Sequence, residues 1–171
     1  MSRIAAVSTT TSLLPKDMLD IVSFWRQAGH ETCMFSCDDQ APLAHIDPVE
    51  FDALIVLGSS DTLCPLGYNE SLWNSVQGFD AIKKTVAGIG TGALVLAHAG
   101  LLVGKRATCN PTPAVIADLK LHGALYSNES PVVAGWIVTA TRGGTHSFAE
   151  AVLDNLAAAK APRFHLQGAT Q

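Results

Sequence analysis

Charged residues are scarce in this chain of 171 residues, and this scarcity excludes several classes of protein. Only 15% of the residues are charged and 48% are apolar, the reverse of the balance found in disordered chains. No basic cluster offsets the net charge of −4, so nucleic-acid binding has no electrostatic footprint. No apolar run reaches the 18 residues typical of a membrane span. We expect one folded domain with neither a nucleic-acid nor a membrane partner.

The amino-terminal residues lack the long apolar stretch of a signal peptide, so we expect a cytoplasmic protein. In that reducing compartment Cys33, Cys37, Cys64 and Cys109 are expected to be free thiols. The Cys33/Cys37 pair has no second pair at zinc-like spacing. The sequence therefore indicates no metal site, and nothing in it demands an organic cofactor.

Apolar runs and helical periodicity alternate along the chain. The pattern predicts strands at 3–8, 31–36, 51–57, 85–89, 106–108, 132–133 and 136–140, and helices at 16–27, 72–84 (broken near Gly78), 91–102, 113–120 and 145–159. Strand–helix alternation predicts an α/β fold: a three-layer sandwich with a mostly parallel sheet and helices on both faces, as in flavodoxin-like proteins. We assign residues 1–160 to this single domain and 161–171 to a carboxyl-terminal tail.

The most specific stretch of the sequence runs from Ala87 to Pro111, AGIGTGALVLAHAGLLVGKRATCNP. It resembles the nucleophile-elbow region of the ThiJ/PfpI superfamily, which has the class-I glutamine-amidotransferase-like fold and includes isonitrile hydratases and the Parkinson-disease-associated deglycase. The segments FDALIVLGSSD and GWIVTATRGGTHSFAEAVLDNL resemble further parts of that family. The resemblance covers residues 3–156 and implies the same α/β fold.

The chain departs from the family pattern at the positions that carry its chemistry. Gly90 stands where the family has its nucleophilic cysteine, Asn110 where it has a histidine, and Ser59-Ser60 where it has Gly-Gly. A glycine keeps the strained turn of an elbow but deletes the thiol. Mechanisms that need an elbow cysteine are therefore excluded.

The family's acid on the first helix corresponds to Asp17, or to Asp20 if the preceding loop is shifted. If Asp17 is buried without a thiol partner, desolvation raises its pKa and suits it to proton transfer near neutral pH. The expected site combines Asp17 as acid/base with substrate-binding groups, which are Ser59, Ser60, Gly90, Thr91 and Asn110. Gly90 and Thr91 enter this set through their backbone amides.

Several of these residues have plainer explanations. An acid in a first helical turn is favoured by the helix dipole, and Asn110 before Pro111 suits a turn. Cys64 and Cys109 are less favoured candidates for displaced nucleophiles. His98 is expected to face outward or an interface, and His146 to lie near the mouth of the pocket. Arg142 suits either an anionic substrate group or the stabilisation of its loop.

Three functions follow from this pattern. The first is a cysteine-independent enzyme that acts on a small metabolite as a hydratase, dehydratase, cyclase or isomerase. The second is a catalytically inactive member that binds a small molecule or serves as a scaffold. The third, the sensor domain of a regulator, lacks a helix-turn-helix segment on this chain. The resemblance also implies a homodimer.

Overall fold

The computed structural model describes residues 1–8, 16–37, 43–58 and 69–161. Its main sheet contains β1 (Arg3–Ser8), β2 (Glu31–Ser36), β3 (Ala53–Leu57), β4 (Thr85–Ile89), β7 (Val132–Ala134) and β8 (Ile137–Ala140), in the order β2-β1-β3-β4-β8-β7. All neighbours are parallel except β7 and β8, which form an antiparallel pair. The predicted α/β fold with a mostly parallel sheet is confirmed. Ser59, Ser60 and Cys64 lie outside the described residues.

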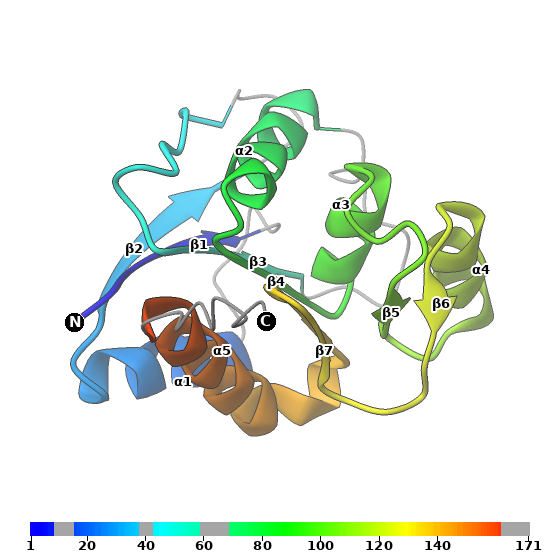
Figure 1. The fold of residues 1–171 in the computed structure, drawn as a ribbon. Coiled ribbons are helices and arrows are strands. Elements are labelled where there is room, and N and C mark those ends of the chain that lie inside the picture. The colour runs from blue at the N-terminus through cyan, green and yellow to red at the C-terminus, as the bar shows by residue number, and fades with distance from the viewer. Residues whose placement is uncertain (9–15, 38–42, 59–68, 162–171) are drawn as a thin grey trace, which may run out of the picture.

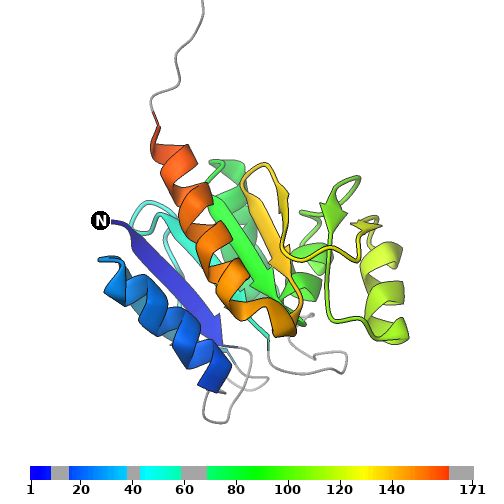
Figure 2. The ribbon, with the colours of Figure 1, turned by 90° about the horizontal axis from the view of Figure 1, so that it is seen from below.

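The central strands are apolar because both faces of the sheet are covered, as Figures 1 and 2 show. Every residue of β3 and β4 is buried. Helices α1 (Lys16–Gln27) and α5 (Thr145–Lys160) pack on one face, where Trp25 Nε1 donates a hydrogen bond to the Ala149 carbonyl at 3.1 Å. Helices α2 (Glu70–Ala81) and α3 (Gly92–His98) pack on the other face.

Helices α2 and α3 differ from their predicted bounds. The α2 helix begins earlier because Asn69 caps it, with Oδ1 accepting from the Leu72 amide at 2.9 Å. It continues through Gly78, since burial of Val76 and Phe79 on either side outweighs the low helix propensity of glycine. The α3 helix ends at His98, four residues before its predicted end, and Gly100 follows at φ +85°.

A small second layer follows α3. Strands β5 (Arg106–Ala107) and β6 (Leu125–Tyr126) form a two-stranded parallel sheet, and α4 (Pro113–Leu121) connects them. The sequence analysis did not predict β6, since two residues carry no periodic signal. The chain then returns through β7 and β8 to the 3₁₀ helix η2 (Arg142–Gly144), which leads directly into α5.

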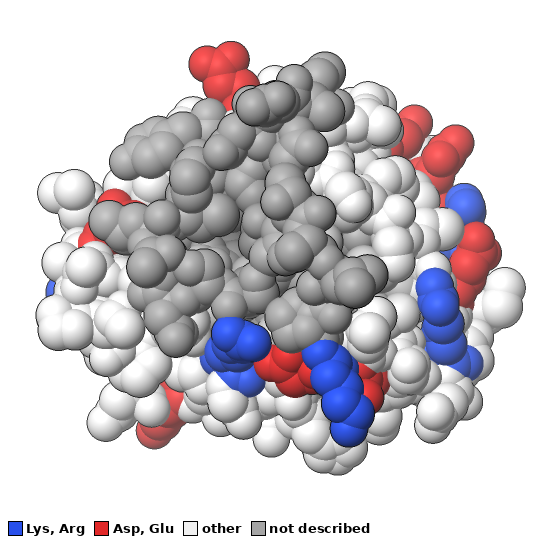
Figure 3. Space-filling view, turned by 180° about the vertical axis from the view of Figure 1, so that it is seen from behind, with Lys and Arg blue, Asp and Glu red and all other residues white. Residues whose placement is uncertain are grey.

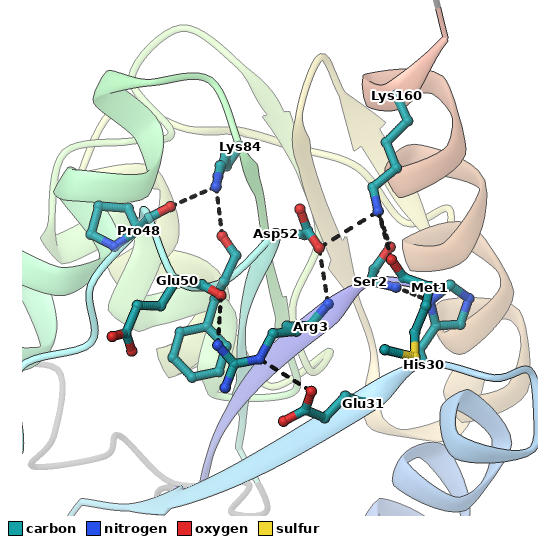
Figure 4. A network of polar contacts seen from close by, with 11 residues as sticks. Met1, Ser2, Arg3, His30, Glu31, Pro48, Glu50, Asp52, Lys84 and Lys160 are labelled. Carbon is teal, nitrogen blue, oxygen red and sulfur yellow. Dashed lines mark hydrogen bonds and ion pairs between the residues drawn. The ribbon is translucent and has the colours of Figure 1, made fainter.

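A polar network at the amino ends of the strands connects the amino terminus to the last residue of α5 (Figure 4). The Asp52 carboxylate accepts from the Arg3 amide at 2.9 Å and lies 3.6 Å from Lys160 Nζ. Lys160 also donates to Ser2 Oγ at 2.8 Å, and the Ser2 amide donates to His30 Nδ1 at 3.2 Å. These contacts fasten the end of α5 to β1, at the opposite end of the sheet from the carboxyl ends where ligands bind in this architecture.

None of the helices in the described ranges is long and apolar enough to cross a lipid bilayer.

Candidate functional site

The turn between β4 and α3 lies at the carboxyl end of the sheet. Gly90 occupies this turn at φ +62°, and its amide donates to the Ala140 carbonyl at the end of β8 at 2.9 Å. The neighbouring strand ends alongside, with the Gly58 amide bonded to the Ile89 carbonyl at 3.1 Å. The sequence interpretation of Gly90 as the residue of a strained turn agrees with this geometry.

The surroundings of Gly90 leave no room for a side chain. A Cβ atom added there would stand 2.7 Å from the Gly58 carbonyl oxygen, closer than real Cβ contacts. A Cβ at Gly92 would meet the Val56 carbonyl oxygen at 2.2 Å, so the start of α3 lies directly against the backbone of β3. A thiol at position 90 would therefore require the backbone after β3 to move. The Gly58 carbonyl oxygen lies too close to Gly90 for a side chain at position 90.

Asn110 and Arg142 link this turn to α1. The Asn110 side chain is buried, and its Nδ2 lies 3.4 Å from the place that a Cβ of Gly90 would take. Its Oδ1 accepts from the Arg142 amide at 3.0 Å. Arg142 Nε in turn donates to Asp17 Oδ2 at 3.2 Å. The structure thus brings Gly90, Asn110 and Asp17 into one connected group through Arg142.

Asp17 lies in the first turn of α1, as predicted, but its carboxylate is not buried. Its side chain is 33% exposed and that of Arg142 is 36% exposed, so the ion pair meets solvent. The condition for the sequence-based expectation about Asp17, burial without a thiol partner, does not hold, because the carboxylate is not buried. An aspartate in this position instead has a guanidinium beside it and access to a dissolved molecule.

Asp20 follows Asp17 by three residues on the same helix, α1. It lines a groove of about 240 Å³ between α1 and α5, together with Ile21, Phe24, Thr145, His146 and Ala149. Of the two acids that the sequence left open, Asp17 is the one in contact with Arg142.

Of the two backbone amides predicted to bind substrate, that of Gly90 already donates to the Ala140 carbonyl. Thr91 is buried, and its Oγ1 has no hydrogen-bond partner within the described part of the chain. The Thr91 hydroxyl lies against Gly58, because a Cβ added at Gly58 would stand 2.5 Å from Thr91 Oγ1.

Cys109, one of the two candidate nucleophiles, is not suited to that role, and Cys64 lies outside the described residues. Cys109 is fully buried, and burial is the main cause that raises the pKa of its thiol to about 12, with the nearby Asp118 carboxylate adding to the shift. The thiol is therefore protonated at neutral pH. Cys33 and Cys109 form no disulfide bond, as predicted.

The structure places the two histidines that the sequence analysis considered, and His98 differs from its expectation. His98 does not face outward: its side chain is 4% exposed, and its Nε2 lies 2.6 Å from Asp118 Oδ2. His146 is 72% exposed and pairs with Glu150 one turn further along α5. Sequence reasoning had no signal for the His98 contact, because α4 reaches it only through tertiary packing.

The charged side chains visible on the face opposite to that of Figure 1 lie at its periphery (Figure 3). Most of the described surface on that face is uncharged. The described part of this face therefore carries no broad charged patch.

Comparison with known proteins agrees with this architecture. Residues 27–155 match the model of the DJ-1/PfpI family. An uncharacterized protein of Methanocaldococcus jannaschii is 35% identical over 101 residues, which cover 56% of this chain and 46% of that protein. This chain therefore aligns with about half the length of that curated relative.

Solved structures share the fold at low sequence identity. A ThiJ/PfpI domain protein from Brachyspira murdochii superimposes with a TM-score of 0.77 at 24% identity, covering 91% of this chain and 96% of that one. DJ-1beta of Drosophila melanogaster gives a TM-score of 0.72 at 19% identity, covering 92% and 91%. With the family model matched over most of the chain, this protein belongs to the DJ-1/PfpI family.

Proposed function

We propose that this protein is a cysteine-independent enzyme that acts on a small metabolite by acid/base chemistry, as a hydratase, dehydratase, cyclase or isomerase. The observation that carries the proposal is the Asp17–Arg142 pair, 3.2 Å apart, partly exposed and connected through Asn110 to an elbow that holds no thiol. General acid/base catalysis needs a carboxylate that substrate can reach, and Asp17 meets that condition.

Asp17, Arg142 and Asn110 have different roles in the proposed proton transfer. The Asp17 carboxylate accepts a proton from the substrate and returns it to another atom or to departing water. Arg142 contributes a permanent positive charge beside the reacting centre, which suits an oxyanion or a substrate carboxylate. Asn110 holds the backbone of Arg142 in place and is a positioning residue. In a dehydration, for example, Asp17 takes the proton of a C–H bond, that bonding pair forms the C=C bond, and the C–O bond breaks as the departing hydroxide receives the proton as water. Neither a thiol nor an acyl-enzyme is required.

The same contacts also support a second function, the binding of a small molecule without catalysis. Asp17 and Asn110 already bond to Arg142, so the group is satisfied in the absence of another molecule. Such a group suits a protein that binds a small polar ligand without converting it. The two functions differ in whether product forms.

Two further features are part of this proposal. We place the reaction in the cytoplasm, which the absence of a disulfide bond at Cys33 and Cys109 supports. We also propose a homodimer, which family membership and exposed apolar side chains such as Leu121 and Leu125 support.

Mass spectrometry of a small-molecule extract from the host cell tests the proposal. The extract is incubated with wild type, with Asp17→Asn and with Asp20→Asn as the matched control on the same helix. We expect a product shifted by one water, or isomeric with its precursor, with wild type and Asp20→Asn and not with Asp17→Asn. Far-ultraviolet circular dichroism verifies that all three proteins are folded.

Unchanged metabolite profiles with wild-type protein would contradict the enzyme and favour the binding function. Equal turnover by Asp17→Asn and wild type would remove Asp17 from the mechanism.

A further inference from the structure

Two histidines and an aspartate converge between α3 and α4, away from the elbow. His98 Nε2 lies 2.6 Å from Asp118 Oδ2, and His122 Nδ1 lies 3.5 Å from Asp118 Oδ1. One ligand atom from each residue lies within 4.8 Å of the other two. One carboxylate therefore lies beside a nitrogen atom of each of two imidazoles. This mixed nitrogen and oxygen donor set suits a first-row transition metal.

The local sequence explains the pairing on α4. Asp118 and His122 are four residues apart, which places them on one face of the helix. His122 Nδ1 lies 2.9 Å from the Asp118 backbone carbonyl, a contact that orients the ring. Because Nδ1 is also the His122 nitrogen beside the Asp118 carboxylate, metal binding through this atom would replace its contact with the carbonyl.

The cluster is shielded on one side and open on the other. The exposed fractions of the side chains are 4% for His98, 14% for Asp118 and 32% for His122. The two imidazole rings stack with their centroids 4.0 Å apart, and the Trp73 ring meets His98 edge-on at 6.4 Å. A metal ion would reach the cluster from the His122 side and have an apolar shell behind it.

The charge around the cluster favours a cation. His98 is the last residue of α3 and His122 caps α4, so both histidines stand at the negative end of a helix dipole. The two turns touch, since the Gly104 amide donates to the Gly123 carbonyl at 2.9 Å. The two lysines near these helix ends in the sequence, Lys105 and Lys120, have their ammonium groups over the aromatic rings of Trp136 and Tyr126, respectively.

The two imidazole rings stack with their centroids 4.0 Å apart, and an imidazole lone pair lies in the plane of its ring. The rings therefore have to splay apart for both to bind one ion. Ligand atoms about 2.0–2.2 Å from a metal lie about 3 Å or more apart, so the His98–Asp118 contact needs to open only slightly.

We propose that His98, Asp118 and His122 bind one divalent transition-metal ion, with Zn²⁺ as the best fit. The ion joins the end of α3 to the end of α4 and retains at least one position for water. The sequence analysis predicted no metal site because it considered cysteine spacing alone. The proposal is independent of the function assigned to Asp17.

Calorimetric titration of the chelator-treated protein with Zn²⁺ tests the site. We expect one equivalent to bind to wild type, and affinity to fall by at least about tenfold in Asp118→Asn and in His122→Ala. His146→Ala is the matched control, because this exposed histidine pairs with Glu150 elsewhere, and it should bind as wild type does. Zn²⁺ should also raise the unfolding temperature of wild type and of the control.

Titration with Co²⁺ identifies the donor atoms. We expect visible bands typical of nitrogen and oxygen ligands and no near-ultraviolet thiolate charge-transfer band. The proposal is overturned if wild type binds no stoichiometric Zn²⁺, if Asp118→Asn and His122→Ala both bind with unchanged affinity, or if the Co²⁺ spectrum shows a thiolate.

Discussion

The absence of a side chain at Gly90 limits the chemistry that the turn after β4 can support. Two separate costs oppose any side chain there: the left-handed backbone at φ +62° and the contact with the Gly58 carbonyl. Gly29 shares only the first cost, since it has φ +85° and no atom within 4 Å of an added Cβ. The pair therefore separates backbone strain from crowding.

We predict that Gly29→Ala lowers the free energy of unfolding by about 1–2 kcal/mol, the cost of a left-handed conformation. Gly90→Ala should lower it further, because the backbone after β3 must also shift. Urea denaturation of both variants measures the difference. Equal losses would show that the crowding at Gly90 relaxes without cost.

The Cys109 thiol provides a second prediction for a single residue. Because burial raises its pKa to about 12, it should resist alkylation by iodoacetamide at pH 7.5 in the folded protein. Cys33 is only partly buried and should react under the same conditions. Peptide mass spectrometry quantifies both sites. Alkylation of Cys109 as rapid as that of Cys33 would contradict the described burial.

Helix boundaries depend on single capping contacts at the scale of one element. Asn69 Oδ1 caps α2, and we predict that Asn69→Ala lowers the free energy of unfolding by about 1 kcal/mol. Asn74→Ala, at an exposed position inside the same helix, should be neutral or slightly stabilising, because alanine has the higher helix propensity. Chemical denaturation checks both, and equal losses would argue against the cap.

The elements that the sequence predicted best are those with a strong, continuous pattern. The apolar runs of β3 and β4 and the periodic face of α1 carry their own signal, because burial on one or both faces requires those residues. The end of α3 was missed because Leu101 and Leu102 are buried without being helical. Apolar periodicity reports burial, and burial continues beyond the helix.

The candidate site was predictable only in part. Resemblance to the family selected Asp17, Gly90 and Asn110, and the structure connects them. The link between them, Arg142, comes from η2, 125 residues after Asp17, and only the packing of α5 on α1 brings it near. The same limit applies to His98 and Asp118, which meet through the packing of α3 on α4.

At the scale of the whole molecule, His30, which lies near the amino terminus and the end of α5, makes the free energy of unfolding depend on pH. Burial is the first cause that lowers the pKa of His30 from 6.5, followed by the charges of the amino terminus and Lys160. The unfolded chain therefore binds a proton more readily at this residue. Its contribution is complete above pH 6.5 and declines as the pH falls below that value.

We predict that unfolding free energy falls less between pH 7 and pH 5 in His30→Gln than in wild type. His45→Gln, which changes an exposed histidine, serves as the control and should follow wild type. Urea denaturation across this pH range measures the slopes. Identical slopes for His30→Gln and wild type would contradict the assignment.

The proposed homodimer is also a prediction for the whole molecule. Val103, Leu121 and Leu125 expose more than half of their surface, a feature that association would relieve. Sedimentation velocity at micromolar concentration should show a species of twice the 18.0-kDa chain mass. A single 18.0-kDa species would contradict the dimer.

The central claim is that this family member performs acid/base chemistry without a thiol. A catalytic thiol has to meet substrate, so it must also react with a small reagent such as methyl methanethiolsulfonate. The most direct measurement is product formation in the metabolite extract before and after thiomethylation of the wild-type protein. The account predicts equal product yield from both samples, and loss of product that dithiothreitol restores would contradict it.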